Sequence, residues 1–104
     1  MTLTGKSREQ FLNIFGVDKL VALQQFYNKT DVEQNALIVD FFDSKGIYIN
    51  IKSKFGQRKQ CERFAYHVRH FNSGFIFNSR QEATIEAIKS ANGVNNKIWK
   101  KGML

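Results

Sequence analysis

The chain has 104 residues, 42% of them apolar, with ten phenylalanines, no proline and a net charge of +7. This length and composition predict one globular domain over residues 1–104 with a packed core, and they exclude a disordered chain. A single cysteine excludes an internal disulfide framework, and the sequence has neither a signal-like apolar start nor a run of ~18 apolar residues. We therefore expect a cytoplasmic protein with no membrane segment.

The positive charge is unevenly distributed along the chain. Residues 1–44 have a net charge of −2, from four basic and six acidic side chains. Residues 45–104 have a net charge of +9, from twelve basic and three acidic side chains. Six of the bases lie between Lys52 and Arg69, where Glu62 is the single acid. Charge gathered in this way predicts a polyanionic partner, although an acidic protein surface or a merely solubilising face would also suit it.

Two short amphipathic helices are predicted near the start of the chain. Ser7-Arg8-Glu9-Gln10 has the capping-box pattern and precedes Phe11, Leu12, Ile14 and Phe15, and Gly16 marks the end of this helix. Asp18 can cap a second helix with the apolar residues Leu20, Leu23, Phe26 and Tyr27. The pair has the spacing of a helix-turn-helix, but Lys19 is the only base of the second helix, so we interpret the pair as a cover for a sheet.

A β-hairpin is predicted over about residues 36–54. The apolar run from Ala36 to Phe42 favours a first strand, and Asp43-Ser44-Lys45-Gly46 is typical of a turn. In the second strand, Ile47, Ile49 and Ile51 alternate with Tyr48, Asn50, Lys52 and Lys54, which indicates one buried and one exposed face.

Residues 57–71 are predicted to form a basic helix. Cys61, Phe64, Ala65, Val68 and Phe71 recur at helical spacing, and the opposite side then carries Lys59, Arg63, Tyr66, His67 and His70. A strand stays open as an alternative, because Phe64, Tyr66 and Val68 also alternate.

A short third strand at about 74–78 and a C-terminal helix at about 79–92 complete the predicted fold. Ser79 and Glu82 are spaced as a capping box, and Asn92-Gly93 is a stop signal. We therefore expect an α+β fold in which a small antiparallel sheet packs against N-terminal helices, the basic helix and the C-terminal helix.

The cations and tyrosines of the middle segment are the candidate nucleic-acid-binding residues. We predict that positive side chains hold the phosphate backbone and that two tyrosines stack on bases or ribose. The phosphate-binding residues are Lys52, Lys54, Arg58, Lys59, Arg63, His67 and His70, and the stacking residues are Tyr48 and Tyr66. His67 and His70 lack a third histidine and Cys61 would point away from them, so we expect no metal, no cofactor and no catalytic residue.

Two families resemble parts of this pattern. Tyr48-Ile49-Asn50 and Arg58 resemble the second tyrosine motif and the catalytic arginine of GIY-YIG nucleases, which implies that Glu82 or Glu86 would bind the metal; Asn50, however, replaces the motif glycine. If residues 57–71 form a strand, the order of elements instead resembles the α-β-β-β-α arrangement of double-stranded RNA-binding domains, without the basic signature of that family at Ser79-Arg80.

From these observations we expect a small basic, non-enzymatic nucleic-acid-binding protein. The alternatives are a protein-interaction or inhibitor module of the phage or mobile-element type, whose basic face binds an acidic partner, and a divergent nuclease. The open edges of a three-stranded sheet would also allow two copies to pair as a dimer.

Overall fold

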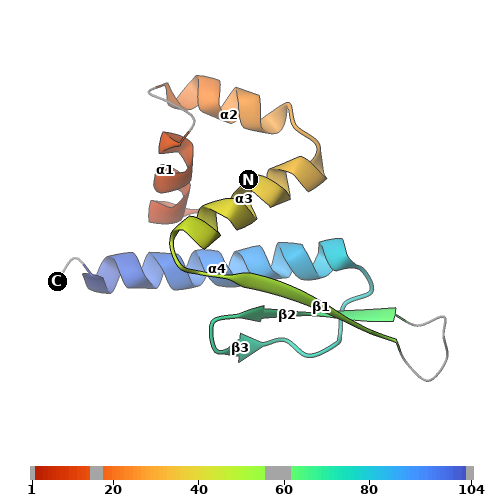
Figure 1. Cartoon of the computed structure of the whole chain (residues 1–104). Coiled ribbons are helices and arrows are strands. Elements are labelled where there is room, and N and C mark those ends of the chain that lie inside the picture. The colour runs from red at the N-terminus through yellow and green to blue at the C-terminus, as the bar shows by residue number, and fades with distance from the viewer. Residues whose placement is uncertain (1, 15–17, 56–61, 103–104) are drawn as a thin grey trace.

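A computed structural model describes residues 2–14, 18–55 and 62–102 of the chain, with the side chains of Lys19 and of residues 99–102 left aside. The elements follow in the order α1 (Gly5–Asn13), α2 (Lys19–Tyr27), α3 (Asp31–Ser44), β1 (Ile49–Phe55), β2 (Glu62–Val68), β3 (Phe71–Asn72) and α4 (Arg80–Gly102). The strands form an antiparallel sheet of order β1-β2-β3. The long helix α4 packs on β1 and β2, while α1 and α3 pack against α4 (Figure 1). The predicted α+β class is therefore confirmed.

The predicted first strand of the hairpin is wrong, because residues 36–44 belong to α3. A capping box that begins this helix explains the difference: the Thr30 hydroxyl accepts from the Glu33 N–H at 3.2 Å, and Glu33 Oε1 accepts from the Thr30 N–H at 3.1 Å. Ile38, Phe41 and Phe42 are buried at helical spacing. The apolar run is therefore one face of a helix, despite its β-branched residues.

The predicted turn at residues 43–46 is instead the C-terminal cap of α3. Gly46 has φ +75°, its N–H donates to Asp43 O at 3.0 Å, and the Ile47 N–H donates to Phe42 O at 2.9 Å. This pair of bonds is a Schellman motif, and its left-handed residue favours glycine. The chain then leaves the helix with Ile47 buried and enters β1.

The predicted basic helix at 57–71 is also wrong. Glu62–Val68 forms β2, the central strand, which pairs with β1 in the register Ile49↔Val68 to Phe55↔Glu62. The third strand lies earlier than predicted, at Phe71–Asn72, and Phe77 adds an isolated bridge to Phe64. A lone strand cannot satisfy its backbone, and β1 finds its partner here because residues 36–44 are helical.

The helices at the two ends of the chain match the prediction in part. Asp18 caps α2 as predicted, by accepting from the Leu20 N–H at 2.9 Å, and Ser79 Oγ accepts from the Glu82 N–H at 3.1 Å near the start of α4. Ser7, however, does not cap α1 but lies buried inside it, and the predicted stop at Gly16 lies outside the described residues. The stop predicted at 92–93 is wrong, because α4 continues to Gly102.

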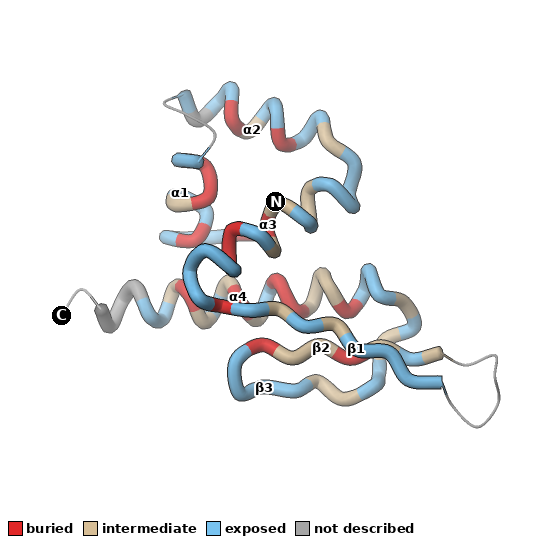
Figure 2. The backbone as a smooth tube through the Cα atoms, in the orientation of Figure 1, coloured by how far each residue is buried: buried red, intermediate tan, exposed pale blue. Residues whose placement is uncertain are grey.

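The core lies between the helices and one face of the sheet. Phe11 meets Phe26 and Phe41 edge to face, with ring centroids 5.4 and 5.6 Å apart. The cluster continues through Ile47 and Val68 to the small-residue stripe of α4, which consists of Ala87, Ile88 and Ala91. Figure 2 shows buried segments on all four helices and on β2, whereas β1 and β3 have none. The helices thus cover one face of the sheet.

A polar cluster joins α1 to α4 beside this core. Asn96 Oδ1 accepts from the Ser7 N–H at 3.0 Å, and Asn95 Nδ2 donates to Ser7 Oγ at 2.9 Å. Asn92 Oδ1 accepts from the Thr4 N–H at 3.1 Å. These bonds span more than 80 residues of sequence and explain why α4 extends past Asn92-Gly93: its asparagines bind the start of α1.

Candidate nucleic-acid interface

The register of β1 and β2 decides which side chains share a face of the sheet. Residues directly opposite each other in an antiparallel pair point to the same side. The pairs Ile49↔Val68 and Ile51↔Tyr66 belong to the core side, because Val68 is buried and the other three pack against the core cluster. The alternate pairs therefore form the other face, which we call the outer face: Asn50↔His67, Lys52↔Ala65 and Lys54↔Arg63.

Four of the predicted phosphate-binding residues meet on the outer face. Lys52, Lys54 and Arg63 are exposed and His67 is half-buried. Lys54 and Arg63 stand directly opposite each other, although like charges at such a position repel. Within the described ranges, no carboxylate forms an ion pair with these three cations, whereas Lys6 and Lys89 are paired with Glu9 and Glu86. An anion bound across the outer face would relieve this repulsion.

Polar and aromatic groups accompany these cations. Asn72 of β3 pairs with His67 and so shares the outer face, where His67 of β2 lies between it and Asn50 of β1. Lys54 Nζ lies 5.7 Å from the centroid of the Phe75 ring, which places this half-exposed ring at the same face. Arg63 donates from Nη1 to Asn78 Oδ1 just beyond it. Asn72 and Phe75 were not among the predicted site residues, because only the pairing of β2 with β3 places them here.

The other predicted site residues that the structure describes lie elsewhere. Tyr48 precedes β1 and is 62% exposed, which leaves its ring open to solvent. Tyr66 lies on the core side, between Phe71 and Phe77 at centroid distances of 5.6 and 5.9 Å, and so does not share the outer face. His70 is exposed in the turn between β2 and β3. Arg58 and Lys59 fall outside the described residues, in the connection from β1 to β2.

The acidic half of the chain lies apart from this face. Asp31, Glu33, Asp40 and Asp43 are exposed on α3, and in Figure 1 α1 to α3 lie on one side of α4 while β2 and β3 lie on the other. Hydrogen bonds from the backbone N–H and hydroxyl of Thr30 lower the pKa of the Glu33 carboxyl below its ordinary value. That carboxylate is thus held at the helix start and does not neutralise the outer face.

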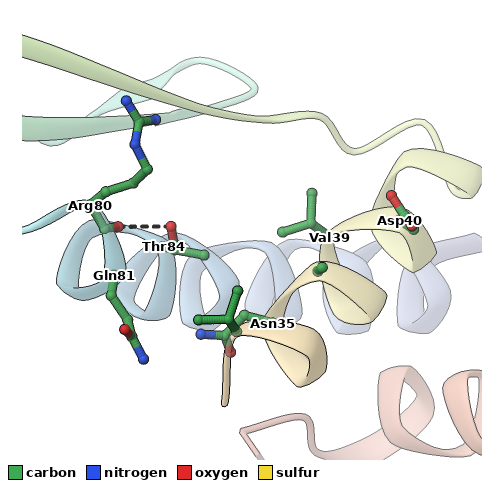
Figure 3. Close-up of a pocket in the computed structure, with 8 residues that line it drawn as sticks. Asn35, Val39, Asp40, Arg80, Gln81 and Thr84 are labelled. Atoms are coloured by element: carbon green, nitrogen blue, oxygen red, sulfur yellow. Dashed lines mark hydrogen bonds between the residues drawn. The ribbon is translucent and has the colours of Figure 1, made fainter. Parts of the chain in front are cut away.

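A groove of about 440 Å³ separates α3 from α4 on that acidic side. Val32, Ala36 and Val39 supply an apolar wall, and Gln81 and Thr84 of α4 form the other (Figure 3). Arg80 extends from the groove toward the strands, where its guanidinium lies 5.6 Å from the Phe64 ring centroid. Asp40 is then the one charged side chain left at the rim among the lining residues, so this groove lacks converging groups for chemistry.

The residues required by the nuclease resemblance are engaged in local contacts. The Glu82 carboxylate accepts from the Asn78 N–H at 3.2 Å, and Glu86 pairs with Lys89 Nζ at 3.0 Å. Within the described part of the chain, no cluster of three or more His, Cys, Asp or Glu could hold a metal ion. Arg58 and Cys61 lie outside that part.

No family model, curated protein sequence or solved structure is found to match the chain. Among the described helices, none is both long and apolar enough to cross a membrane.

Proposed function

We propose that the chain is a small basic, non-enzymatic nucleic-acid-binding protein that contacts the phosphate backbone with the outer face of its sheet. One observation supports this above the others: Lys52, Lys54 and Arg63 share an exposed face with no ion-pairing carboxylate in the described residues, and two of them oppose each other directly. Charge repulsion raises the free energy of this face when it is empty, and bound phosphates lower it again.

The geometry favours a narrow track of phosphate contacts. The pair Lys54↔Arg63 and the pair Asn50↔His67 are four residues apart along β1, which corresponds to roughly 13 Å of strand. Lys and Arg side chains along this line would hold the backbone without reading sequence, because phosphate contacts position a nucleic acid but do not specify it. We therefore expect weak sequence preference.

A salt titration tests the proposal. With three permanent cations on the outer face, the logarithm of the affinity for a single strand should fall with the logarithm of salt with a slope of about −2, or roughly 20-fold between about 50 and 200 mM. Lys54→Gln and Arg63→Gln should each reduce the slope by about 0.7. A slope near zero, or no binding in low salt, would remove the proposal.

Lys89→Gln is the matched control for these variants. It removes the same unit of charge from an exposed lysine of α4 that is paired with Glu86. If binding depends only on net charge, Lys89→Gln should weaken it as much as Lys54→Gln does. If binding depends on the outer face, the control should stay close to the unmodified protein.

An acidic protein surface is the second candidate partner, since the same three cations would suit carboxylates. Exposed apolar side chains on α2 favour a protein contact: Leu20 is 77% and Tyr27 54% exposed. Purification at low salt separates the candidates. A stoichiometric acidic protein that accompanies the chain without nucleic acid, and that Lys54→Gln releases, would support this second function over the first.

A further inference from the structure

A second cationic surface lies where the sheet ends, next to α4. An open groove of about 490 Å³ separates the β2–β3 turn from residues 90–98 of α4. Phe71, Val94 and Ile98 give it an apolar floor, and Arg69, His70 and Lys97 surround it. Phe71 is 54% and Ile98 43% exposed, so the groove presents a half-exposed aromatic ring, which packs on Tyr66, beside three basic side chains.

The groove has no acidic lining residue, and within the described part of the chain no ion pair holds Arg69 or Lys97. An apolar floor with cations at its rim complements a ligand that is flat and apolar at one end and anionic at the other. A nucleotide has this form, because its base can stack on an aromatic ring while its phosphate binds Arg or Lys.

The conformation of Arg69 also sets this turn apart. Val68 pairs with Phe71, so Arg69 and His70 form a two-residue hairpin loop. Arg69 has φ +55° and is the one described non-glycine residue with positive φ. Glycine, asparagine or aspartate adopts this region with less strain. A long cation at a position that suits glycine costs stability, and such costs persist where the side chain has a use.

The groove lies on the opposite side of the sheet from the outer face, and the β2–β3 turn joins the two. His67 and Asn72 on that face are adjacent to the pair Val68↔Phe71 that closes the turn. Successive residues of a strand point to opposite sides, so Val68 and Phe71 point to the core side. A strand of nucleic acid on the outer face reaches Arg69 and His70 at the end of the sheet, and by passing around this turn it would bring one further nucleotide to Phe71.

We propose that the groove between the β2–β3 turn and α4 binds one unstacked base of a single-stranded nucleic acid, with Phe71 under the base and Arg69, His70 and Lys97 at its phosphate. This inference rests on the proposed nucleic-acid function and narrows the substrate class to single strands. A base inside a duplex is stacked and paired and cannot reach the ring without being extruded, whereas an unpaired base can.

The test compares a labelled single strand of about 12 nucleotides with the blunt duplex of the same sequence, by fluorescence anisotropy in low salt. The single strand should bind at least tenfold more tightly. Phe71→Leu should weaken single-strand binding on the order of tenfold and leave duplex binding unchanged, while Phe71→Tyr should restore it. Phe55→Leu is the matched control, because Phe55 is also exposed (62%) but ends β1 at the opposite end of the sheet from Phe71.

Arg69→Gly provides an independent variant. It should lose single-strand affinity while its melting temperature stays level or rises, because glycine fits the positive φ better than arginine does. A fall in both would indicate a role confined to folding.

The outcomes separate the two proposals. If neither nucleic acid binds in low salt, the proposed function fails and this inference fails with it. If both bind with equal affinity and Phe71→Leu matches the Phe55→Leu control, the groove is not a base site, and the outer face alone accounts for binding.

Discussion

The bonds from Asn96 to the first turn of α1 give the sharpest prediction about stability. Thr4, the residue before α1, makes no side-chain cap bond. Asn96 of α4 replaces it: its Oδ1 accepts from the Ser7 N–H at 3.0 Å and from Ser7 Oγ at 3.1 Å, and its Nδ2 donates to Thr4 O at 3.1 Å. The start of a helix is normally capped by the side chain of the residue just before it, whereas α1 is capped by Asn96, 89 residues away from Ser7.

The magnitude for Asn96→Ala follows from this geometry. Loss of a cap costs about 1–2 kcal/mol, since a partly buried N–H is left without an acceptor. Alanine favours the interior of α4 by about 0.5 kcal/mol over asparagine, which offsets part of the cost. The net loss in the free energy of unfolding is about 0.5–1.5 kcal/mol, and the melting temperature should fall by roughly 2–12 °C.

Asn96→Asp is the control for Asn96→Ala. The carboxylate keeps the acceptor for Ser7 and adds a negative charge near the N-terminus of α1, which is favourable. It replaces the donor to Thr4 O by an oxygen that repels this carbonyl, so its melting temperature should lie between those of the Ala variant and the unmodified protein. Thermal melts followed by circular dichroism make the comparison. Equal melting temperatures for the Ala and Asp variants would refute capping by Asn96.

Three further changes test other parts of the fold. Gly5→Ala should lower the melting temperature, because Gly5 has φ +59° and an added Cβ would lie 3.3 Å from the Asn96 side chain. Phe42→Ala should lower the free energy of unfolding in urea by about 3–5 kcal/mol, because Phe42 is fully buried in the core. The Thr30 bonds lower the pKa of Glu33, so the stability that its carboxylate contributes is present above its ordinary pKa and is lost as the pH falls through the lowered pKa. In thermal melts across the acidic range, Glu33→Gln should therefore lose less stability than the unmodified protein does.

The α+β class could be predicted from the sequence because several local signals agree with the fold. Asp18 begins α2, and the alternation from Ile49 to Lys54 survives as β1. Ile38 and Val39 favour a strand where the structure has the helix over residues 31–44, although Thr30-x-x-Glu33 has the capping-box spacing that marks a helix start. A capping signal outweighed propensity in this segment.

Residues 62–68 could not be assigned by local pattern, because Phe64 and Val68 fit both periods. Tertiary context decides between them. Because residues 36–44 are helical, the segment that precedes β1 in the sequence offers it no strand partner. An isolated strand would leave its N–H and C=O groups unpaired. Glu62–Val68 is the next segment able to pair antiparallel with it across a short connection. The two wrong predictions, a strand over residues 36–42 and a helix over residues 57–71, are thus linked. A strand at 36–42 would pair with β1 and leave residues 62–68 without a strand partner.

Predicting a helix in place of β2 changes the fold more than it changes the set of residues in the candidate site, and the reason is geometric. Arg63 and His67 are four residues apart, so they share a face whether the chain turns by about 100° or by about 180° per residue. Tyr66 is three residues from Arg63 and joins it only in a helix, which is why the strand places it on the core side. Lys52 and Lys54 belong to β1, where the structure confirms the predicted alternation, and the register then brings them beside Arg63. The convergence of these cations thus follows from spacings that both periods allow, together with one pairing that only the fold supplies.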